Sequence, residues 1–334
     1  MHIPENYLSP STCGVLGAVM VPIWLPAIRK VKETVPREKL PLLGVAAAFS
    51  FLAMMFNVPL PGGTTGHAVG GTLIAILLGP YAACLSVSVA LLIQALFFGD
   101  GGILAFGANS FNIAFALPFT GYFVYHGVKK LISSDIIAAG IGSYVGINVA
   151  AFCAAVEFGI QPLLFTDAAG QALYCPYPLS ISIPAMMIGH ITIFGLAEVI
   201  FTTGVLAYLK KTSPALFHMS APASSSKSLF GLLAALILAT PLGLLAAGTA
   251  WGEWDAEELA ETDFFGSALG YTPAGMENGF SFDVLMPDYA IAGLPDVLGY
   301  IISALVGTAL LIIIFKVIAS FLPAKPSFDT PSQH

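Results

Sequence analysis

The sequence has few charged residues, and this shortage excludes a water-soluble globular domain. Asp, Glu, Lys and Arg make up 9% of its 334 residues, whereas hydrophobic residues make up 57%. Soluble domains carry about 25% charged residues. The apolar residues form continuous rather than alternating runs, many of them about 20 residues long, which is the length of a helix that crosses a bilayer. The composition therefore predicts an all-α, polytopic membrane protein.

Several chemical motifs are also missing. The four cysteines show no C-x-x-C spacing, so neither a redox nor a cysteine metal centre is indicated. The sequence contains no G-x-x-x-x-G-K-[ST] motif for ATP and no H-E-x-x-H motif. A membrane haem enzyme would need paired histidines within the apolar runs, and only His190 lies clearly inside one. We therefore expect a protein that is not an enzyme, with no permanent cofactor and no nucleic-acid partner.

Lys and Arg are absent from about half of the connections between apolar runs, and this asymmetry predicts the topology. All twelve basic residues fall near 29–39, 128–134 or 210–228, or around the C-terminal tail. Basic connections normally face the cytoplasm. About nine transmembrane helices satisfy this rule, with the N-terminus outside and the C-terminus inside the cell inner (plasma) membrane. The predicted spans are 10–28, 40–58, 66–79, 81–98, 103–127, 135–160, 181–209, 229–250 and 297–321.

A loose, serine-rich segment divides the predicted helices into seven plus two. Residues 213–227 read as a cytoplasmic linker that follows a seven-helix module, 1–212. The second module, 228–322, has two helices around an extracytoplasmic loop, 251–296, which holds ten acidic residues and no basic one. Such a loop attracts cations or is simply solvated. Residues 323–334 form a predicted cytoplasmic tail.

The first two residues form a potential chelating group. No basic residue precedes the first apolar run, and Pro22 and Pro26 interrupt it, so a cleavable signal is not indicated. His2 is too large for normal removal of Met1, so we expect a free amine at Met1. That amine, the backbone amide of His2 and its imidazole can close fused five- and six-membered rings around one ion. Square-planar nitrogen sites suit Ni(II) and Cu(II).

His67 is the natural fourth nitrogen for such a site. It ends a glycine-rich stretch that begins at Pro59, and the predicted topology places this loop on the same side as Met1. We expect His67 to begin a helix, whose dipole would keep the imidazole neutral and able to bind metal. The alternative is a solvated loop histidine and a chance histidine at position 2.

Three stretches give the chain a resemblance to a known family. They are Met1-His2-Ile3-Pro4-Glu5, residues 59–71 with His67, and Phe106-Gly107-Ala108-Asn109-Ser110-Phe111-Asn112. They resemble the substrate-binding M component of energy-coupling-factor cobalt/nickel transporters over about residues 1–210. The resemblance implies that Met1, His2 and His67 bind transported Ni2+ or Co2+. It also implies partners, namely a transmembrane coupling (T) component and ABC-type ATPase subunits.

The second module resembles the small N component of the same transporters. The likeness lies in two helices, an extracytoplasmic loop and the stretch Met286-Pro287-Asp288-Tyr289, which departs from the Pro-Asp-Gly-Leu-Glu pattern of that family. Fusion of the M and N components is more typical of the nickel branch, and this favours nickel modestly over cobalt.

Polar residues within the predicted spans leave alternatives open. Asn109, Ser110 and Asn112 either support the metal ligands from behind or join helices by hydrogen bonds. Glu157, His190 and Glu198 are ionisable groups in membrane segments, where such groups are often functional. An ion-coupled secondary transporter that uses these three residues is therefore the alternative function.

Overall fold

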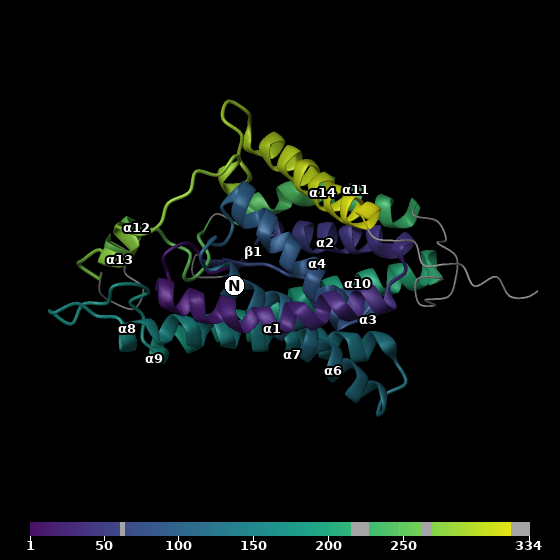
Figure 1. Cartoon of the computed structure of the whole chain (residues 1–334), viewed down its shortest axis with the longest axis horizontal. Coiled ribbons are helices and arrows are strands. Elements are labelled where there is room, and N and C mark those ends of the chain that lie inside the picture. The colour runs from purple at the N-terminus through teal and green to yellow at the C-terminus, as the bar shows by residue number, and fades with distance from the viewer. Residues whose placement is uncertain (61–63, 215–226, 247, 262–268, 322–334) are drawn as a thin grey trace, which may run out of the picture.

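The computed structural model describes residues 1–60, 64–214, 227–246, 248–261 and 269–321, and most of them are helical. Most long helices run along the longest axis of the molecule (Figure 1). The principal helices are α1 (Pro10–Thr34), α2 (Leu40–Met54), α3 (Gly71–Leu78), α4 (Pro80–Ile93), α6 (Leu117–Lys129), α7 (Asp135–Gly159), α9 (Leu179–Gly189), α10 (Gly195–Thr212), α11 (Lys227–Ala239) and α14 (Asp296–Phe321).

Shorter elements connect or extend these helices. The short helices are α5 (Phe106–Asn109), α8 (Gln161–Leu164), α12 (Ala256–Glu261) and α13 (Ala274–Glu277). Wider π-helical turns occur at Gln94–Phe98, Ser110–Ala116 and His190–Phe194, and 3-10 turns at Arg37–Lys39, Thr240–Leu245 and Pro287–Tyr289. The predicted linker and tail lie almost wholly outside the described residues.

The protein is a polytopic helical membrane protein, as predicted. Among the described residues, six helical segments are long and apolar enough to cross a bilayer. They are Pro10–Thr34, Pro80–Phe98, Asp135–Leu164, Leu179–Thr212, Lys227–Leu245 and Asp296–Phe321. Helix α3 has eight residues, or about 12 Å of helix, which is too short to cross by itself. The count of nine crossings and their orientation stay a prediction.

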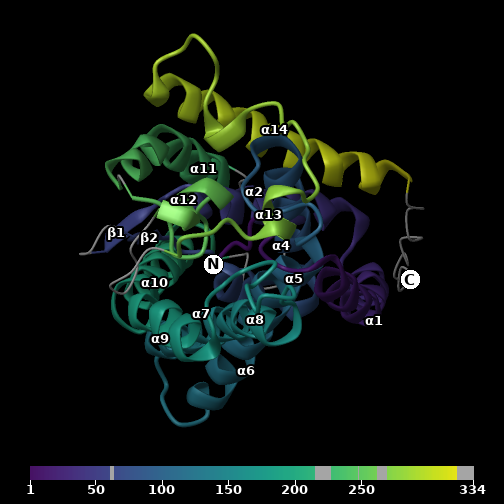
Figure 2. The same ribbon diagram turned by 90° about the vertical axis from the view of Figure 1, so that its left-hand side faces the viewer.

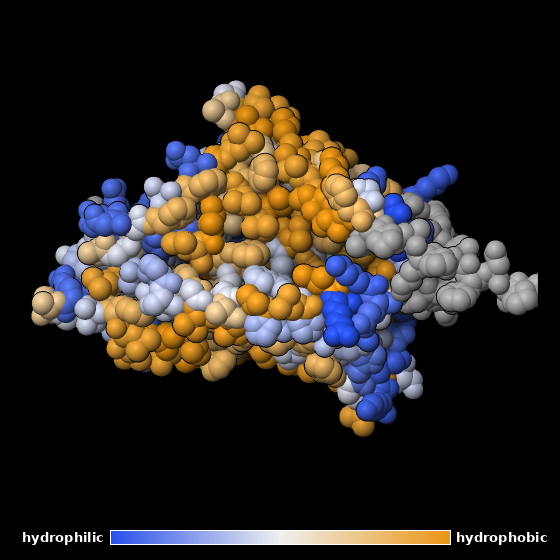
Figure 3. Space-filling view, in the orientation of Figure 1, coloured by the Kyte–Doolittle hydropathy of each residue, from blue (hydrophilic) through white to orange (hydrophobic). Residues whose placement is uncertain are grey.

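Polarity is distributed along the molecule as a bilayer requires. Hydrophobic side chains cover the middle of the helical bundle, and hydrophilic side chains gather toward its two ends (Figure 3). Lipid tails offer no hydrogen bonds, so apolar side chains are favoured on the surface that faces them. Helix α1 illustrates this, since only four of its 25 residues are buried and Val15 and Leu25 are each 62% exposed.

Helix α2 forms the centre of the protein core. Twelve of its 15 residues are buried, and it is apolar on every side. It packs closely against α14 of the second module: a Cβ added at Gly307 would lie 2.3 Å from the ring of Phe51. The two predicted modules therefore share one packed core.

The start of the chain is buried inside this bundle, near the middle of its length (Figure 1). When the molecule is viewed along its long axis, the N-terminus is surrounded by helices of the first module (Figure 2), whereas Figure 1 shows α12 and α13 farther toward one end of the molecule. Ser9 caps α1, because its side chain accepts a hydrogen bond from the amide of Thr12. The cap fixes where the helix begins and leaves residues 1–8 to enter the bundle.

A small β-hairpin was not predicted. Strand β1 (Val58–Leu60) pairs with antiparallel strand β2 (Thr64–Gly66), and Pro59 lies opposite Thr65. The hairpin leads directly into His67 and so fixes the direction from which this residue reaches the bundle.

The close packing of α6 against α7 generates a stability prediction. A Cβ added at Gly142 would lie 2.6 Å from the carbonyl oxygen of Gly121, which cannot move without shifting the helix. We expect Gly142→Ala to lower the free energy of unfolding by about 1–3 kcal/mol. Gly204→Ala on α10 is the matched control, because nothing lies within 4 Å of its added Cβ. Thermal unfolding of the purified protein measures both, and equal midpoints would contradict this packing.

Candidate metal centre

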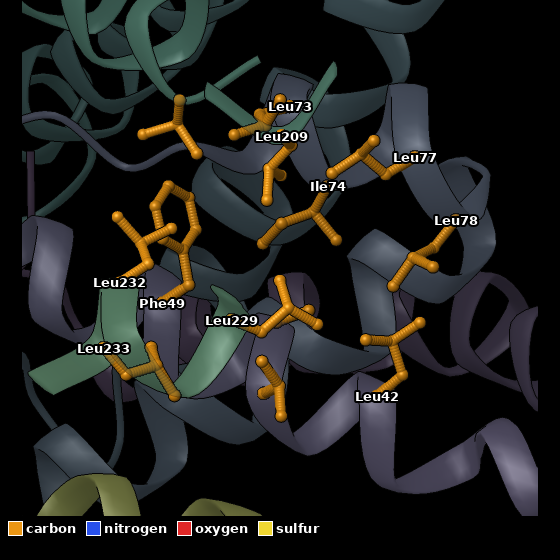
Figure 4. A pocket seen from close by; sticks show the side chains of 13 residues that line it. Leu42, Phe49, Leu73, Ile74, Leu77, Leu78, Leu209, Leu229, Leu232 and Leu233 are labelled. Carbon is orange, nitrogen blue, oxygen red and sulfur yellow. The ribbon is translucent and has the colours of Figure 1, made fainter. Parts of the chain in front are cut away.

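Two of the cavities in the described structure have opposite chemistry. One of about 50 Å³ lies between α2, α3, α10 and α11, and only hydrophobic side chains line it (Figure 4). It offers no side-chain ligand to an ion. The other, of about 200 Å³, lies beside the start of the chain and is lined by His2, Pro4, Met54, Asn57, His67, Gly99, Asp100, Gly101, Glu253, Asp288, Tyr289 and Tyr300. The polar cavity is therefore the candidate site.

The first three residues are buried inside the protein. Met1 is 4% exposed, His2 3% and Ile3 0%. Asn109 holds Ile3 from both sides: the Ile3 amide donates to Asn109 Oδ1 (2.7 Å), and Asn109 Nδ2 donates to the Ile3 carbonyl (3.0 Å). The amide of Gly102 also donates to that carbonyl (2.8 Å). Three hydrogen bonds thus fix the backbone of the chain start at Ile3.

Glu5 provides a second anchor for the chain start. Its carboxylate accepts hydrogen bonds from the amides of Ile103 (2.6 Å) and Leu104 (3.3 Å). Burial raises the pKa of Glu5, and the backbone hydrogen bonds only partly oppose this rise. Gly102 allows the close approach, because a Cβ there would lie 2.8 Å from the Glu5 backbone.

The two histidines predicted as ligands meet in the cavity. His2 Nδ1 lies 3.2 Å from His67 Nε2, and the ring centroids are 4.9 Å apart. His67 Nδ1 lies 3.2 Å from the carbonyl oxygen of Ala68, which can only accept, so this contact places the ring proton on Nδ1 and leaves the Nε2 lone pair free. Burial lowers the pKa of His67 well below its usual value, and the neighbouring His2 lowers it further. A neutral imidazole with a free Nε2 is the form that binds a metal ion.

One expectation about His67 is wrong. His67 does not begin a helix, since α3 starts at Gly71 after a left-handed Gly70 (φ 71°). The helix dipole is therefore not the cause of the low pKa of His67. Burial and His2 cause it instead.

Asp100 is a site residue that the sequence analysis missed. Its Oδ1 lies 2.9 Å from His2 Nδ1. Burial alone would raise the pKa of Asp100, but attraction and a hydrogen bond from His2 outweigh it and hold the pKa below the usual range. Asp100 lies within Gly99-Asp100-Gly101-Gly102, after the predicted span 81–98. The topology already placed this acid on the same side as His67, and that signal could have identified it.

The second module also contributes to the site. The hydroxyl of Tyr289 donates to Asp100 Oδ2, and Gln94 Nε2 donates both to that oxygen (2.9 Å) and to the Tyr289 hydroxyl oxygen (2.9 Å). Glu253 Oε1 lies 3.5 Å from the Met1 amine. Burial raises the pKa of Glu253, and the nearby amine opposes this rise. The Met1 amine and the His2 imidazole therefore each lie beside one carboxylate.

Other predicted residues have different neighbours. Asn112 donates to Glu157 (2.7 Å), and the Ser110 hydroxyl is buried without a hydrogen bond to the described residues. His190 Nδ1 bonds to the Met186 carbonyl (2.8 Å) on its own helix. Glu198 accepts hydrogen bonds from the amides that follow His67. In the described part of the chain, no hydrogen bond links Glu157, His190 and Glu198, as an ion path through these three would require.

Side chains alone do not complete a metal site. Within the described ranges, no three His, Cys, Asp or Glu side chains converge in a way that could hold an ion. Two imidazoles converge, and the remaining nitrogen donors nearby are the Met1 amine and the His2 amide. The arrangement therefore fits a site that uses main-chain nitrogen.

Comparison with known proteins places the chain in a family. The family model described as "cobalt uptake substrate-specific transmembrane region" matches residues 2–216, and the PDGLE domain model matches residues 225–324. A probable fused nickel transport protein of Lactiplantibacillus plantarum is 48% identical, over 95% of this chain and 97% of the relative. A fused nickel transport protein of Rhodobacter capsulatus is also 48% identical, over 93% of this chain and 95% of the relative.

A solved structure agrees with these matches. The crystal structure of a truncated transition metal transporter shares 53% sequence identity with a TM-score of 0.61, and the match covers 63% of this chain and 99% of that one. The polar cavity at the buried chain start thus occurs in a protein whose sequence and fold both match metal-transport proteins. The chain therefore belongs to the CbiM family of substrate-specific transmembrane components, with a PDGLE domain in the same chain.

Proposed function

We propose that this protein is the substrate-capturing subunit of an ATP-driven uptake transporter for Ni2+ or Co2+. It binds the ion from outside through the Met1 amine, the amide and imidazole of His2, and the imidazole of His67. The observation that carries the proposal is the meeting of His2 Nδ1 and His67 Nε2, 3.2 Å apart, at a buried chain start. Metal-transport relatives at 48% identity over most of the chain support the substrate class.

The ligand set favours a late first-row divalent ion. An amine, a deprotonated amide and two imidazoles form four nitrogen donors in a plane, which suits Ni(II) better than ions that prefer oxygen ligands. The relatives named as nickel transport proteins favour the same ion. Metal-binding nitrogens must be deprotonated, so binding of the ion releases protons and affinity decreases as pH falls.

The surrounding carboxylates balance the charge of the ion. With the chain start free of metal, Asp100 faces His2 Nδ1 and Glu253 faces the Met1 amine. When the ion replaces the protons on these nitrogens, both carboxylates remain beside a dication. A site of low dielectric holds a divalent ion well only when negative charge stands close to it.

Transport requires further subunits. The sequence has no P-loop motif, so ATP hydrolysis occurs on separate ABC-type ATPase subunits, and a transmembrane coupling component transmits the motion. This chain supplies the ion site and the membrane body around it. Inward release then follows from a change of this body that separates the nitrogen donors.

The first prediction concerns the chain start. Two alanines inserted before Met1 move the amine about 7 Å along the chain, beyond the buried position of Met1, so that it can no longer close a five-membered chelate ring with the His2 amide. We expect at least a 100-fold loss of Ni(II) affinity, measured by competition with a chelator of known affinity. The control is two alanines added after His334. Unchanged affinity in the N-terminal variant would show that the amine is not a ligand.

The second prediction concerns the two histidines. His67→Ala removes one of four nitrogen donors, and loss of a direct ligand exceeds the ~10–100-fold effect of losing an outer partner. We expect at least a 100-fold loss of affinity and no metal-dependent uptake in cells. His126→Ala is the control, because the His126 ring packs against Tyr122 and Tyr125 in the last turn of α6 and is not among the residues that line the polar cavity. Equal uptake by the His67 and His126 variants would refute the proposed site.

The third prediction concerns Asp100. Asp100→Asn keeps the size of the side chain but removes the charge next to His2. We expect Ni(II) affinity to fall about 10–100-fold. Glu277→Gln, an exposed acid on α13, changes the net charge equally without a contact at the site. If both variants weaken binding to the same degree, the effect is one of overall charge and not of the cavity.

A further inference from the structure

Glu198 is a buried carboxylate with an uncommon set of partners. It lies on α10, is 0% exposed, and belongs to the membrane-spanning segment Leu179–Thr212. Its oxygens accept hydrogen bonds from the amides of Val69 (2.7 Å) and Gly70 (3.0 Å). An ionisable group inside a membrane is costly and usually has a function. Here its partners are the second and third residues after His67.

The same helical segment also contacts the residue that precedes His67. Phe194 lies four residues before Glu198, so the two side chains lie on one face of the helix. A Cβ added at Gly66 would lie 2.7 Å from Cδ2 of Phe194, so the ring packs directly on the Gly66 backbone. Phe194 therefore contacts the residue before His67, while Glu198 binds the residues after it.

A π-helical turn positions these two side chains. The helix widens over His190–Phe194, and α7 braces this turn because the Tyr144 hydroxyl donates to the Ile191 carbonyl (2.7 Å). Such turns are rare and are frequent at functional sites. The turn lies directly before the two contacts with the His67 loop.

The helix continues from the metal site to the opposite end of the bundle. Helix α10 has 18 residues, about 27 Å of helix, and its last turn carries Lys210 and Lys211. At that end Asp135 forms ion pairs with both Lys129 and Lys210, which joins α6, α7 and α10. One rigid element thus links the His67 loop with a charged cluster at the basic end.

We propose that Glu198 and Phe194 are positioning residues that clamp the His67 loop to α10. The inference rests on the proposed role of His67 as a metal ligand. A displacement of α10 at its basic end then pulls Val69 and Gly70 with it and moves His67 away from His2. Loss of one ligand from four lowers the affinity at the moment of release. The clamp couples motion at one membrane face to the ion at the other.

The experiment compares Glu198→Gln with two reference variants. A glutamine keeps the shape but has one acceptor oxygen, and its amide group would oppose the backbone N–H groups of Val69 and Gly70. Glu157→Gln is the matched control, because Glu157 is also a buried carboxylate in a membrane segment but binds Asn112. His67→Ala shows the signature of a site without the fourth ligand. The purified full-length proteins are loaded with Ni(II), and the visible absorption band and the affinity are measured.

We expect Glu198→Gln to bind Ni(II) about 10–100-fold more weakly, with the absorption band shifted toward that of His67→Ala. Glu157→Gln should keep the unmodified band and affinity. A band shift in the Glu198 variant alone supports the clamp. An unmodified band, or an equal shift in both carboxylate variants, overturns it and leaves the metal site intact. If His67→Ala itself leaves the band unchanged, the proposed metal site fails and the clamp fails with it.

A second variant covers the case in which Glu198→Gln does not fold. Phe194→Leu changes no buried charge and removes only the ring that packs on Gly66. We expect the absorption band to shift in the same direction, with an affinity loss of about 3–10-fold. This loss is smaller than the ~10–100-fold effect of losing a hydrogen-bonding partner, because the contact of Glu198 remains. An unmodified band and affinity in this variant would overturn the clamp.

Discussion

The arrangement of the protein depends on one constraint, the burial of a chain end inside a bundle of membrane helices. A free chain start normally remains in water, because its amine is charged and its backbone lacks partners. Here Asn109 and Gly102 satisfy the backbone of Ile3, and Glu5 bonds to the following loop. These contacts replace water and hold the first two residues at a fixed depth. Only with that depth fixed can their nitrogens reach His67.

The same constraint explains why acidic residues of both modules surround the site. A buried amine needs nearby negative charge, which Glu253 provides, and Asp100 lies beside the His2 imidazole. Tyr289 and Gln94 in turn fix the Asp100 carboxylate. Residues of the PDGLE domain therefore line the cavity together with residues of the first domain. In our proposal, the carboxylates that hold the donor groups without metal also neutralise the ion once it binds.

The predicted topology placed the chain start and the His67 loop on one side of the membrane, and the resemblance to the M component implied a shared ion site; in the structure His2 and His67 lie together. Basic residues assigned each connection to a side, and both segments fell on the same one. The polytopic helical fold followed from composition. The hairpin before His67 escaped prediction because its strands have only three residues each, too few for a periodic pattern. The start of α3 at Gly71 was missed for a related reason, because the apolar run continues through residues that are not helical.

Contacts between distant segments account for the remaining differences. Asp100 and Tyr289 are 189 residues apart, and no local pattern indicates that they share a hydrogen bond. Glu198 was an ionisable residue in a span, and nothing in its own helix shows that its partners are backbone amides near His67. Such contacts depend on how helices pack. Asn109 was predicted either to support the metal ligands or to join helices, and in the structure it bonds to the backbone of Ile3, directly after the proposed ligands.

The most direct measurement is nickel-edge X-ray absorption of the full-length protein with its unextended start, loaded with one Ni(II) per chain. The account predicts four nitrogen neighbours in a planar arrangement, with the multiple-scattering signal of two imidazoles. A six-coordinate ion surrounded mainly by oxygen, or a signal with one imidazole, would contradict the central claim that the buried chain start and His67 hold the ion together.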